Sequence, residues 1–380
     1  SIGAVAAGCR FYSAYPMTPA SGILTWMAEH SERCGVVVKQ MEDELAVANA
    51  AIGAGYAGVR SMCATSGGGF ALMTEAIGMA GMIEAPVVFV EVQRGGPSTG
   101  IPTKTEQADL NQVYGASQGD FPRIIIAPKD VEDCFDTAVE AFNLADKYQC
   151  PVIIVTDLLL SEHPETVEPE RFTADVPLDR GEIVTEWKES DGPFKRYKFT
   201  KSGISPRTIP GTANTMYIAA TDDHDEQGVL ISDVFCNSAI RRKVNEKRMK
   251  KIDLALKDLP APKIEGIADA DVTLIGWGSM EGVIREAVQQ LNASGIRTNQ
   301  LHFKYLLPFH TAEAIAILKH TKRTICVEMN STGQFARHLR AETSHAVSDM
   351  ILKYDGEPLE PRQIMAQVRA IVEGKARSLD

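Results

Sequence analysis

The run Val87-Val88-Phe89-Val90 is continuously apolar, and so is the run Val152-Ile153-Ile154-Val155. Such runs are expected for strands that are covered on both faces, which is the usual state of a strand in a parallel sheet. They belong to candidate strands over 87–93 and 152–157, and four further candidates are separated by segments long enough for helices: 10–15, 36–40, 59–65 and 123–127. This alternation predicts an α/β fold built on a doubly wound, mostly parallel sheet.

The alternation stops near residue 165 and returns near residue 267. Residues 166–265 are rich in polar residues, prolines and glycines, so we expect an irregular connecting segment with hairpin strands around Trp187 and Tyr197. Residues 266–380 again alternate, with candidate strands over 272–276, 297–303 and 323–329. The sequence therefore predicts three parts, 1–165, 166–265 and 266–380, of which the last is a second, smaller α/β domain.

Composition excludes several classes of protein. Among 380 residues, 23% are charged and 44% hydrophobic, which argues against a disordered or fibrous chain. The net charge of -11 argues against binding to bulk nucleic acid or to an anionic membrane. A basic helix is expected over 237–256, and a solvated face that touches an acidic neighbour is a better interpretation of it than a nucleic-acid patch. No apolar stretch approaches the ~18 residues of a membrane span, so we expect a cytoplasmic protein.

The seven cysteines are scattered and form no C-x-x-C pair, which argues against an iron–sulfur cluster, a zinc site or a disulfide framework in this chain. The first residue, Ser1, leads directly into the small-residue helical pattern of residues 2–8. We therefore expect the native protein to extend further upstream.

Candidate site residues follow four successive strands. In open α/β sheets ligands bind outside the carboxyl ends of the strands, and this is where Thr18, Glu44, Ser66 and Arg94 fall. Arg94 follows a buried strand and precedes a loop rich in glycine and hydroxyl groups, which suits recognition of a planar carboxylate. One shared site at this edge of the sheet explains the four positions better than four unrelated placements of polar residues.

Each position also has a purely structural interpretation. Thr18 followed by Pro19 could cap a helix, and the acidic run Glu42-Asp43-Glu44 could simply complement a helix dipole. The segment Ala64–Gly69 would let a ligand approach the backbone, but it lacks the full glycine motif of a nucleotide site. Arg94 could pair with a structural carboxylate.

These residues carry a family resemblance. Tyr15-Pro16-Met17-Thr18-Pro19 resembles the Y-P-I-T-P motif of the α subunits of 2-oxoacid:ferredoxin oxidoreductases, with Met17 in place of the usual isoleucine. The resemblance extends, in order, over nearly the whole chain, and within the family it is strongest to the 2-oxoglutarate branch. Its other motifs are Glu42-Asp43-Glu44, Ala64–Gly69, Gln93–Lys104, Gly119–Arg123, Gly203–Arg207, Glu328-Met329-Asn330 and Gly333-Gln334.

The resemblance implies a thiamine-diphosphate-binding fold of the pyrimidine type, followed by a transketolase-C-terminal-like domain. In this family, thiamine diphosphate lies at the junction of an α and a β subunit, and the β subunit holds the diphosphate, Mg²⁺ and a [4Fe-4S] cluster. The assembly is expected to be (αβ)2, with ferredoxin and coenzyme A as further partners. Many relatives of the 2-oxoglutarate branch carry a γ-type domain fused upstream.

The resemblance also implies roles for single residues. Glu44 is expected to be catalytic, because it matches the glutamate that hydrogen-bonds the pyrimidine ring of the cofactor; Glu42 is the fallback, since two residues apart on a helix point about 200° apart. Thr18, Arg94 and Thr103 match substrate-binding residues. Tyr15, Pro16 and Ser66 are expected to line the cofactor, and no metal ligand is assigned to this chain.

The expected substrate is 2-oxoglutarate. A pyruvate- or branched-chain-specific relative and a non-catalytic α-like subunit are the alternatives, while the Y-P-M-T-P and R-G-G-P-S-T-G motifs disfavour a transketolase-type enzyme without an iron–sulfur partner.

Overall fold

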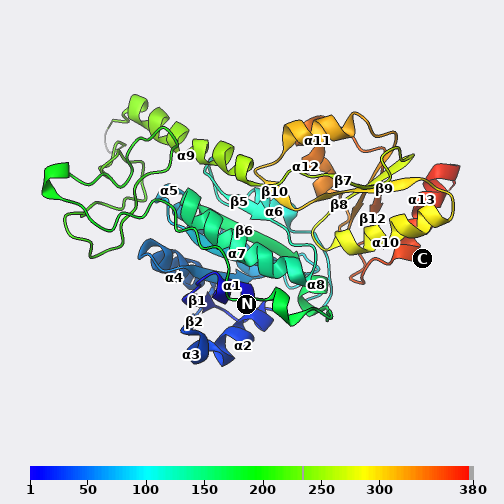
Figure 1. The fold of residues 1–380 in the computed structure, drawn as a ribbon, viewed down its shortest axis with the longest axis horizontal. Helices are drawn as coiled ribbons and strands as arrows, with labels where there is room; N and C mark the ends of the chain where they lie inside the picture. The colour runs from blue at the N-terminus through cyan, green and yellow to red at the C-terminus, as the bar shows by residue number, and fades with distance from the viewer. Residues whose placement is uncertain (233–234, 376–380) are drawn as a thin grey trace.

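A computed structural model describes residues 1–232 and 235–375. A seven-stranded sheet forms the centre of the molecule, in the order β10-β5-β6-β4-β3-β1-β2 (Figure 1). Every pair in it is parallel except β10 with β5. The strands are β1 (Phe11–Ala14), β2 (Val37–Gln40), β3 (Ser61–Thr65), β4 (Val87–Gln93), β5 (Ile124–Ile126), β6 (Pro151–Asp157) and β10 (Tyr305–Leu307). The first six confirm the strands predicted from the sequence.

Helices cover both faces of this sheet, as the term doubly wound requires. Val87 and Phe89 of β4 face one layer, while Val88 and Val90 face the other, because successive side chains of a strand point to opposite sides. The first layer contains α4 and α5, and the second contains α1, α2 and α7. The helices are α1 (Ile2–Ala6), α2 (Ser21–Glu29), α3 (Ser31–Cys34), α4 (Glu44–Tyr56), α5 (Gly67–Met82), α6 (Leu110–Tyr114), α7 (Val131–Tyr148) and α8 (Leu158–Glu162).

The connecting segment after α8 is irregular, as expected, and it projects from one side of the molecule (Figure 1). The expected hairpin strands around Trp187 and Tyr197 are wrong, since both residues lie outside any strand. Their rings pack instead: Trp187 against Phe194 with centroids 5.2 Å apart, and Tyr197 against His224 at 4.0 Å. The segment contains two short 3-10 turns, Pro169–Arg171 and Glu189–Asp191, and ends in α9 (Ser238–Asp258).

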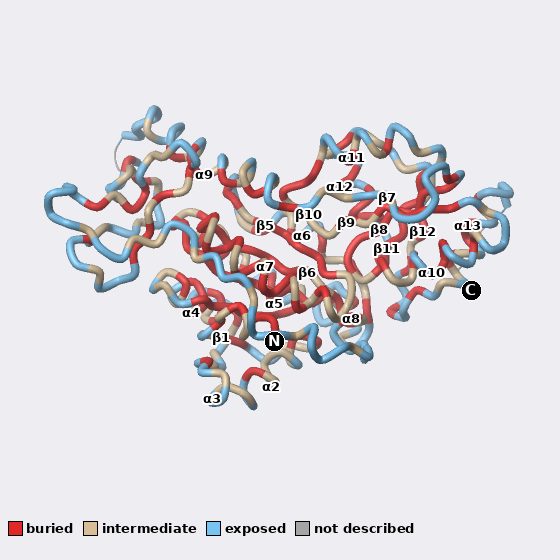
Figure 2. The backbone as a smooth tube through the Cα atoms, viewed as in Figure 1, coloured by how far each residue is buried: buried red, intermediate tan, exposed pale blue. Residues whose placement is uncertain are grey.

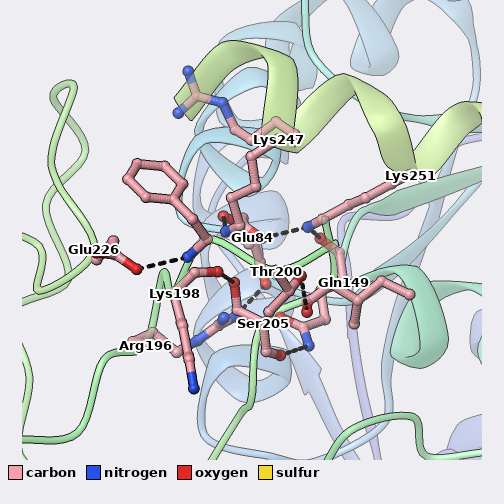
Figure 3. Close-up of polar contacts among 12 residues, drawn as sticks. Glu84, Gln149, Arg196, Lys198, Thr200, Ser205, Glu226, Lys247 and Lys251 are labelled. Atoms are coloured by element: carbon pink, nitrogen blue, oxygen red, sulfur yellow. Dashed lines mark hydrogen bonds and ion pairs between the residues drawn. The ribbon is translucent and has the colours of Figure 1, made fainter. Parts of the chain in front are cut away.

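Helix α9 confirms the predicted solvated basic face only in part: Arg241, Arg242, Lys243 and Lys250 are exposed, whereas three other basic residues are buried. Lys247 and Lys251 are buried and form ion pairs with Glu84, the first at 2.5 Å (Figure 3). Arg248, which is also buried, pairs with Asp223 at 3.1 Å. The expected acidic neighbour is therefore present. Lys247 and Lys251 thereby bind α9 to the loop between α5 and β4, whereas Arg248 binds α9 to the irregular segment before it.

A second, five-stranded sheet follows, in the order β12-β11-β8-β9-β7, and it is parallel except for β7. It has its own buried core (Figure 2). Its strands are β7 (Ile264–Gly266), β8 (Val272–Trp277), β9 (Thr298–Phe303), β11 (Thr324–Glu328) and β12 (Asp349–Leu352), and its helices are α10 (Met280–Ala293), α11 (Thr311–Leu318), α12 (Gln334–Thr343) and α13 (Pro361–Glu373). The domain boundaries at residues 165 and 265 stay a prediction. Within the described part of the chain, no helix combines the length and apolar character needed to cross a membrane.

Candidate functional site

One edge of the large sheet gathers the predicted site residues. Strands β2, β1, β3 and β4 are neighbours and run parallel, so the loops that follow them leave the sheet at the same edge. Thr18, Glu44, Ser66 and Arg94 all lie in the chain within four residues of the end of one of these strands. The expected placement of the four residues at one edge is confirmed.

Glu44 is the first residue of α4 and is only 3% exposed. Its Oε1 has no hydrogen-bond partner among the residues that the structure describes. The preceding Asp43 caps the helix by accepting a hydrogen bond from the N–H of Ala46 at 2.8 Å, so Glu44 is not needed for that task. A buried acceptor that the chain leaves open favours a donor from outside the chain.

Glu42 differs from Glu44 in both position and burial. It lies before α4 and is exposed, so the helical spacing that separated the two carboxylates in the sequence does not apply. Burial separates them instead, because Glu44 alone is enclosed. Gly69, in the first turn of α5, makes room for it: a Cβ atom at residue 69 would lie 2.7 Å from Oε1 of Glu44.

Ser66 occupies the N-cap position of α5, with an extended backbone at φ −124°. It is fully buried, and its Oγ also has no partner among the described residues. The three glycines that follow leave the helix start free of side chains, and the N–H groups of a first helical turn favour acceptors and negative charge. In the part of the chain that the structure describes, Glu44 and Ser66 thus each place a polar atom without a hydrogen-bond partner beside the glycine-rich first turn of α5.

Arg94 connects the loops that follow β4 and β1. Its Nη1 donates a hydrogen bond to the backbone carbonyl of Thr18 at 2.6 Å. Thr18 does not cap a helix, because α2 begins at Ser21 with Ala20 as its N-cap, and the Thr18–Pro19 peptide is cis. Across residues 1–232 and 235–375, no carboxylate lies within the 4.0 Å of an ion pair with Arg94. The guanidinium is partly exposed and keeps further N–H groups available.

Three other predicted residues lie at the surface. Tyr15 and Pro16 are exposed directly after β1, and Thr103 is exposed in the loop between β4 and α6. Hydrogen bonds from Gly95 to Lys104 at 3.1 Å and from Ile101 to Gly95 at 2.9 Å close that loop. Within the described structure, no hydrogen bond joins Thr103 to the other predicted residues, so its role stays a prediction.

Sequence reasoning missed two carboxyl groups beside this edge. Glu91 on β4 is fully buried, and Asp109 precedes α6 with its N–H bonded to Oε1 of Gln93 at 3.0 Å. Burial and the nearby Asp109 raise the pKa of Glu91 well above its usual value. The signal was present in the sequence, because Glu91 interrupts an apolar strand.

Other motif positions hold the fold together. Arg207 binds the buried Asp146 at 2.7 Å, and Glu328 accepts hydrogen bonds from the N–H groups of Phe335 and Ala336 at 2.8 and 2.9 Å. Asn330 donates to the carbonyl of Gln107 at 3.1 Å and so ties the second sheet to the loop before α6. The described residues include no group of three or more His, Cys, Asp or Glu side chains arranged to hold a metal ion.

The chain matches two family models. Residues 2–235 match the model described as "Pyruvate flavodoxin/ferredoxin oxidoreductase, thiamine diP-bdg", and residues 270–364 match that of "Pyruvate:ferredoxin oxidoreductase core domain II". The first of these matches identifies a thiamine-diphosphate-binding domain.

Similar proteins extend the match to the whole chain. It is 38% identical to the α subunit of 2-oxoacid:ferredoxin oxidoreductase 1 from Sulfurisphaera tokodaii over 99% of this chain, but it spans only 61% of that longer relative. It is 33% identical to the 2-oxoglutarate synthase subunit KorA from Methanothermobacter marburgensis, over 96% of this chain and 95% of KorA.

Solved structures agree with these relatives. The 2-oxoglutarate:ferredoxin oxidoreductase from Magnetococcus marinus, with 2-oxoglutarate, coenzyme A and succinyl-CoA bound, superimposes with a TM-score of 0.87 at 39% identity. That match covers 97% of this chain and 63% of the other. A split-gene transketolase matches with a TM-score of 0.53 at 14% identity, which shows a shared fold alone. The chain therefore belongs to the family of 2-oxoacid:ferredoxin oxidoreductase α subunits.

Proposed function

We propose that this chain is the α subunit of a thiamine-diphosphate-dependent enzyme that oxidatively decarboxylates a 2-oxo acid. In the proposed reaction 2-oxoglutarate, coenzyme A and oxidised ferredoxin, the electron acceptor, give succinyl-CoA, CO₂ and reduced ferredoxin. The chain acts only with a β subunit, in an (αβ)2 assembly in the cytoplasm. That β subunit supplies the diphosphate site, Mg²⁺ and the [4Fe-4S] cluster.

The proposal rests on two buried oxygen atoms beside the start of α5 that have no hydrogen-bond partner among the described residues. Oε1 of Glu44 and Oγ of Ser66 are buried and have no partner among the described residues, and Gly67, Gly68 and Gly69 leave space there. These features fit the pyrimidine ring of thiamine diphosphate, which offers nitrogen groups as hydrogen-bond partners. When bound, the cofactor supplies the carbon nucleophile and the electron sink for decarboxylation.

The residues of this chain have distinct proposed roles. Glu44 holds a proton at the pyrimidine ring nitrogen and so controls the basicity of the cofactor. Arg94 holds the carboxylate of the 2-oxo acid through its planar fork of N–H groups until CO₂ leaves, and Thr18 adds one hydrogen bond. Thr103 contributes a second hydroxyl to the substrate, while Tyr15, Pro16 and Ser66 line the cofactor.

The substrate is tested with the enzyme assembled from this chain and its β subunit. The initial rate of reduction of a low-potential acceptor is measured with 2-oxoglutarate, pyruvate and a branched-chain 2-oxo acid, each with coenzyme A. We expect kcat/KM to be at least about tenfold higher for 2-oxoglutarate, a difference of about 1.4 kcal/mol in transition-state binding. Reactions without coenzyme A are the control.

Two outcomes contradict parts of the proposal. A higher kcat/KM for pyruvate or the branched-chain acid assigns the chain to a relative with another specificity. If the assembled protein binds no thiamine diphosphate and reduces no acceptor with any 2-oxo acid, the chain is a non-catalytic α-like subunit.

A further inference from the structure

Two carboxyl side chains, those of Glu91 and Asp109, lie beside the candidate site. Neither has a role in the function proposed above. Glu91 lies on β4, two residues before Gln93, and its side chain points to the same face of the sheet. Asp109 is fixed against that face by the hydrogen bond from its N–H to Oε1 of Gln93 at 3.0 Å. Burial and the charge of Asp109 raise the pKa of Glu91, so the two carboxyl groups lie close together.

A hydrogen bond between the two carboxyl groups requires a proton. Neither oxygen of Glu91 has a hydrogen-bond donor among the described residues, and two carboxylates cannot hydrogen-bond each other. Glu91 is fully buried, whereas Asp109 is partly exposed, so the proton belongs on Glu91. Asp157, a third buried carboxyl nearby, adds to the cost of ionising Glu91.

Asp109, by contrast, lies beside two groups that favour its negative charge, the first turn of α5 and Arg94. A Cβ atom on Gly67 would lie 2.4 Å from Oδ2 of Asp109, so this carboxylate is placed against the first turn of α5. Burial raises the pKa of Asp109 on balance, while Glu91 and the positive charge of Arg94 act to lower it. Burial and the charge of Asp109 raise the pKa of Glu106, a further carboxyl group in the same loop.

We propose that the protonated Glu91 donates a hydrogen bond to an ionised Asp109, and that Asp109 is a positioning residue that orients Arg94. Arg94 is then oriented by the carbonyl of Thr18 at 2.6 Å and, from beyond ion-pair distance, by the charge of Asp109. Its remaining N–H groups keep one direction, toward the substrate carboxylate. The second half of this inference rests on the proposed role of Arg94, and the first half does not.

The proton on Glu91 is tested by infrared spectroscopy of the assembled enzyme. The difference spectrum between wild type and E91Q should contain the carbonyl stretch of one protonated carboxylic acid near neutral pH, and this band should shift in D₂O. A structural role alone produces no such band. If the difference shows an ionised carboxylate instead, the proposed pair is wrong.

Orientation of Arg94 is tested by kinetics with the 2-oxo acid. E91L removes the donor to Asp109, and we expect kcat/KM to fall about tenfold through KM, because a hydrogen bond to a charged group is lost. E91Q restores an N–H donor of the same shape, so it should recover most of that loss. D109N keeps the shape but removes the charge beside Arg94, and it should raise KM to a similar extent while kcat changes little.

The outcomes separate this inference from the proposed function. If R94A leaves KM unchanged, the role of Arg94 fails, while the infrared band still tests the carboxyl pair. If R94A raises KM but D109N and E91L do not, Asp109 does not position Arg94. Equal losses in E91Q and E91L also overturn the hydrogen-bond arrangement.

Discussion

The two ends of α5 differ in how their buried polar groups are satisfied. At the N-terminal end, Glu44 and Ser66 each keep an atom without a partner among the described residues. Beyond the C-terminal end, Glu84 is just as buried but receives both Lys247 and Lys251 (Figure 3). The carboxylate of Glu84 thus joins two segments of the chain, whereas the open atoms of Glu44 and Ser66 fit the proposed ligand at the strand edge.

The largest effect is expected on catalysis, at Glu44 beside the N-terminal end of α5. E44Q should lower kcat of the assembled enzyme about 10²–10⁴-fold, the usual range for loss of general acid–base catalysis. Thermal unfolding should change little, because no hydrogen bond within the described chain reaches Oε1 of Glu44. E42Q is the matched control, since Glu42 is an exposed carboxylate two residues away. Turnover near that of wild type in E44Q contradicts the role of Glu44.

Beyond the C-terminal end of α5, substitution of Glu84 should affect the stability of the fold. E84Q leaves the ammonium groups of Lys247 and Lys251 without their counter-charge inside the protein, which costs about 3–5 kcal/mol. Thermal or denaturant unfolding measures this loss. E357Q is the control, because Glu357 pairs with Lys104 at the surface, where an ion pair contributes at most about 1 kcal/mol. Equal effects of E84Q and E357Q would show that burial does not distinguish the two pairs.

Local pattern was enough to predict much of the large sheet and its functional edge. Apolar runs such as 87–90 mark strands whatever packs on them, and the parallel order of β2, β1, β3 and β4 places Thr18, Glu44, Ser66 and Arg94 together. The resemblance supplied the distinction between Glu44 and Glu42, which the structure accounts for by burial rather than by helical spacing.

Long-range pairing could not be predicted in the same way. Tyr305–Leu307 joins the large sheet next to β5 from a distant part of the chain, and three residues carry too little pattern to reveal it. The basic residues of α9 look like a solvated face because the sequence does not show that Glu84 lies beside them. Trp187 and Tyr197 suggest strands by propensity, but their rings are used in packing.

A smaller catalytic effect is expected at Arg94. R94A should lower kcat/KM for the 2-oxo acid about 10–100-fold, because hydrogen bonds to a charged group contribute about 1.5–3 kcal/mol. R94K keeps the charge but not the planar fork, so it should recover only part of the loss. R33A, at an exposed position on α3, is the control for removal of an arginine. An unchanged kcat/KM in R94A assigns Arg94 a structural role instead.

The smallest expected effect is a pH dependence of stability that comes from Lys247, the partner of Glu84. Burial lowers the pKa of Lys247 from 10.5 to about 7, with Glu84 opposing this shift. Between these values the unfolded chain binds more protons than the folded one, so Lys247 makes stability rise with pH. One proton limits this slope to about 1.4 kcal/mol per pH unit.

The slope is best isolated as a difference between wild type and K247M from pH 7 to 8.5. Burial raises the pKa of Cys9, Cys134 and Cys150 to about 12, so these thiols make stability fall above pH 9 and would obscure the effect there. Methionine keeps most of the length of lysine and removes its titration. We therefore expect denaturant unfolding to show a smaller rise of stability with pH in K247M. Parallel curves would mean that Lys247 stays fully protonated beside Glu84, and that this ion pair outweighs the cost of burial.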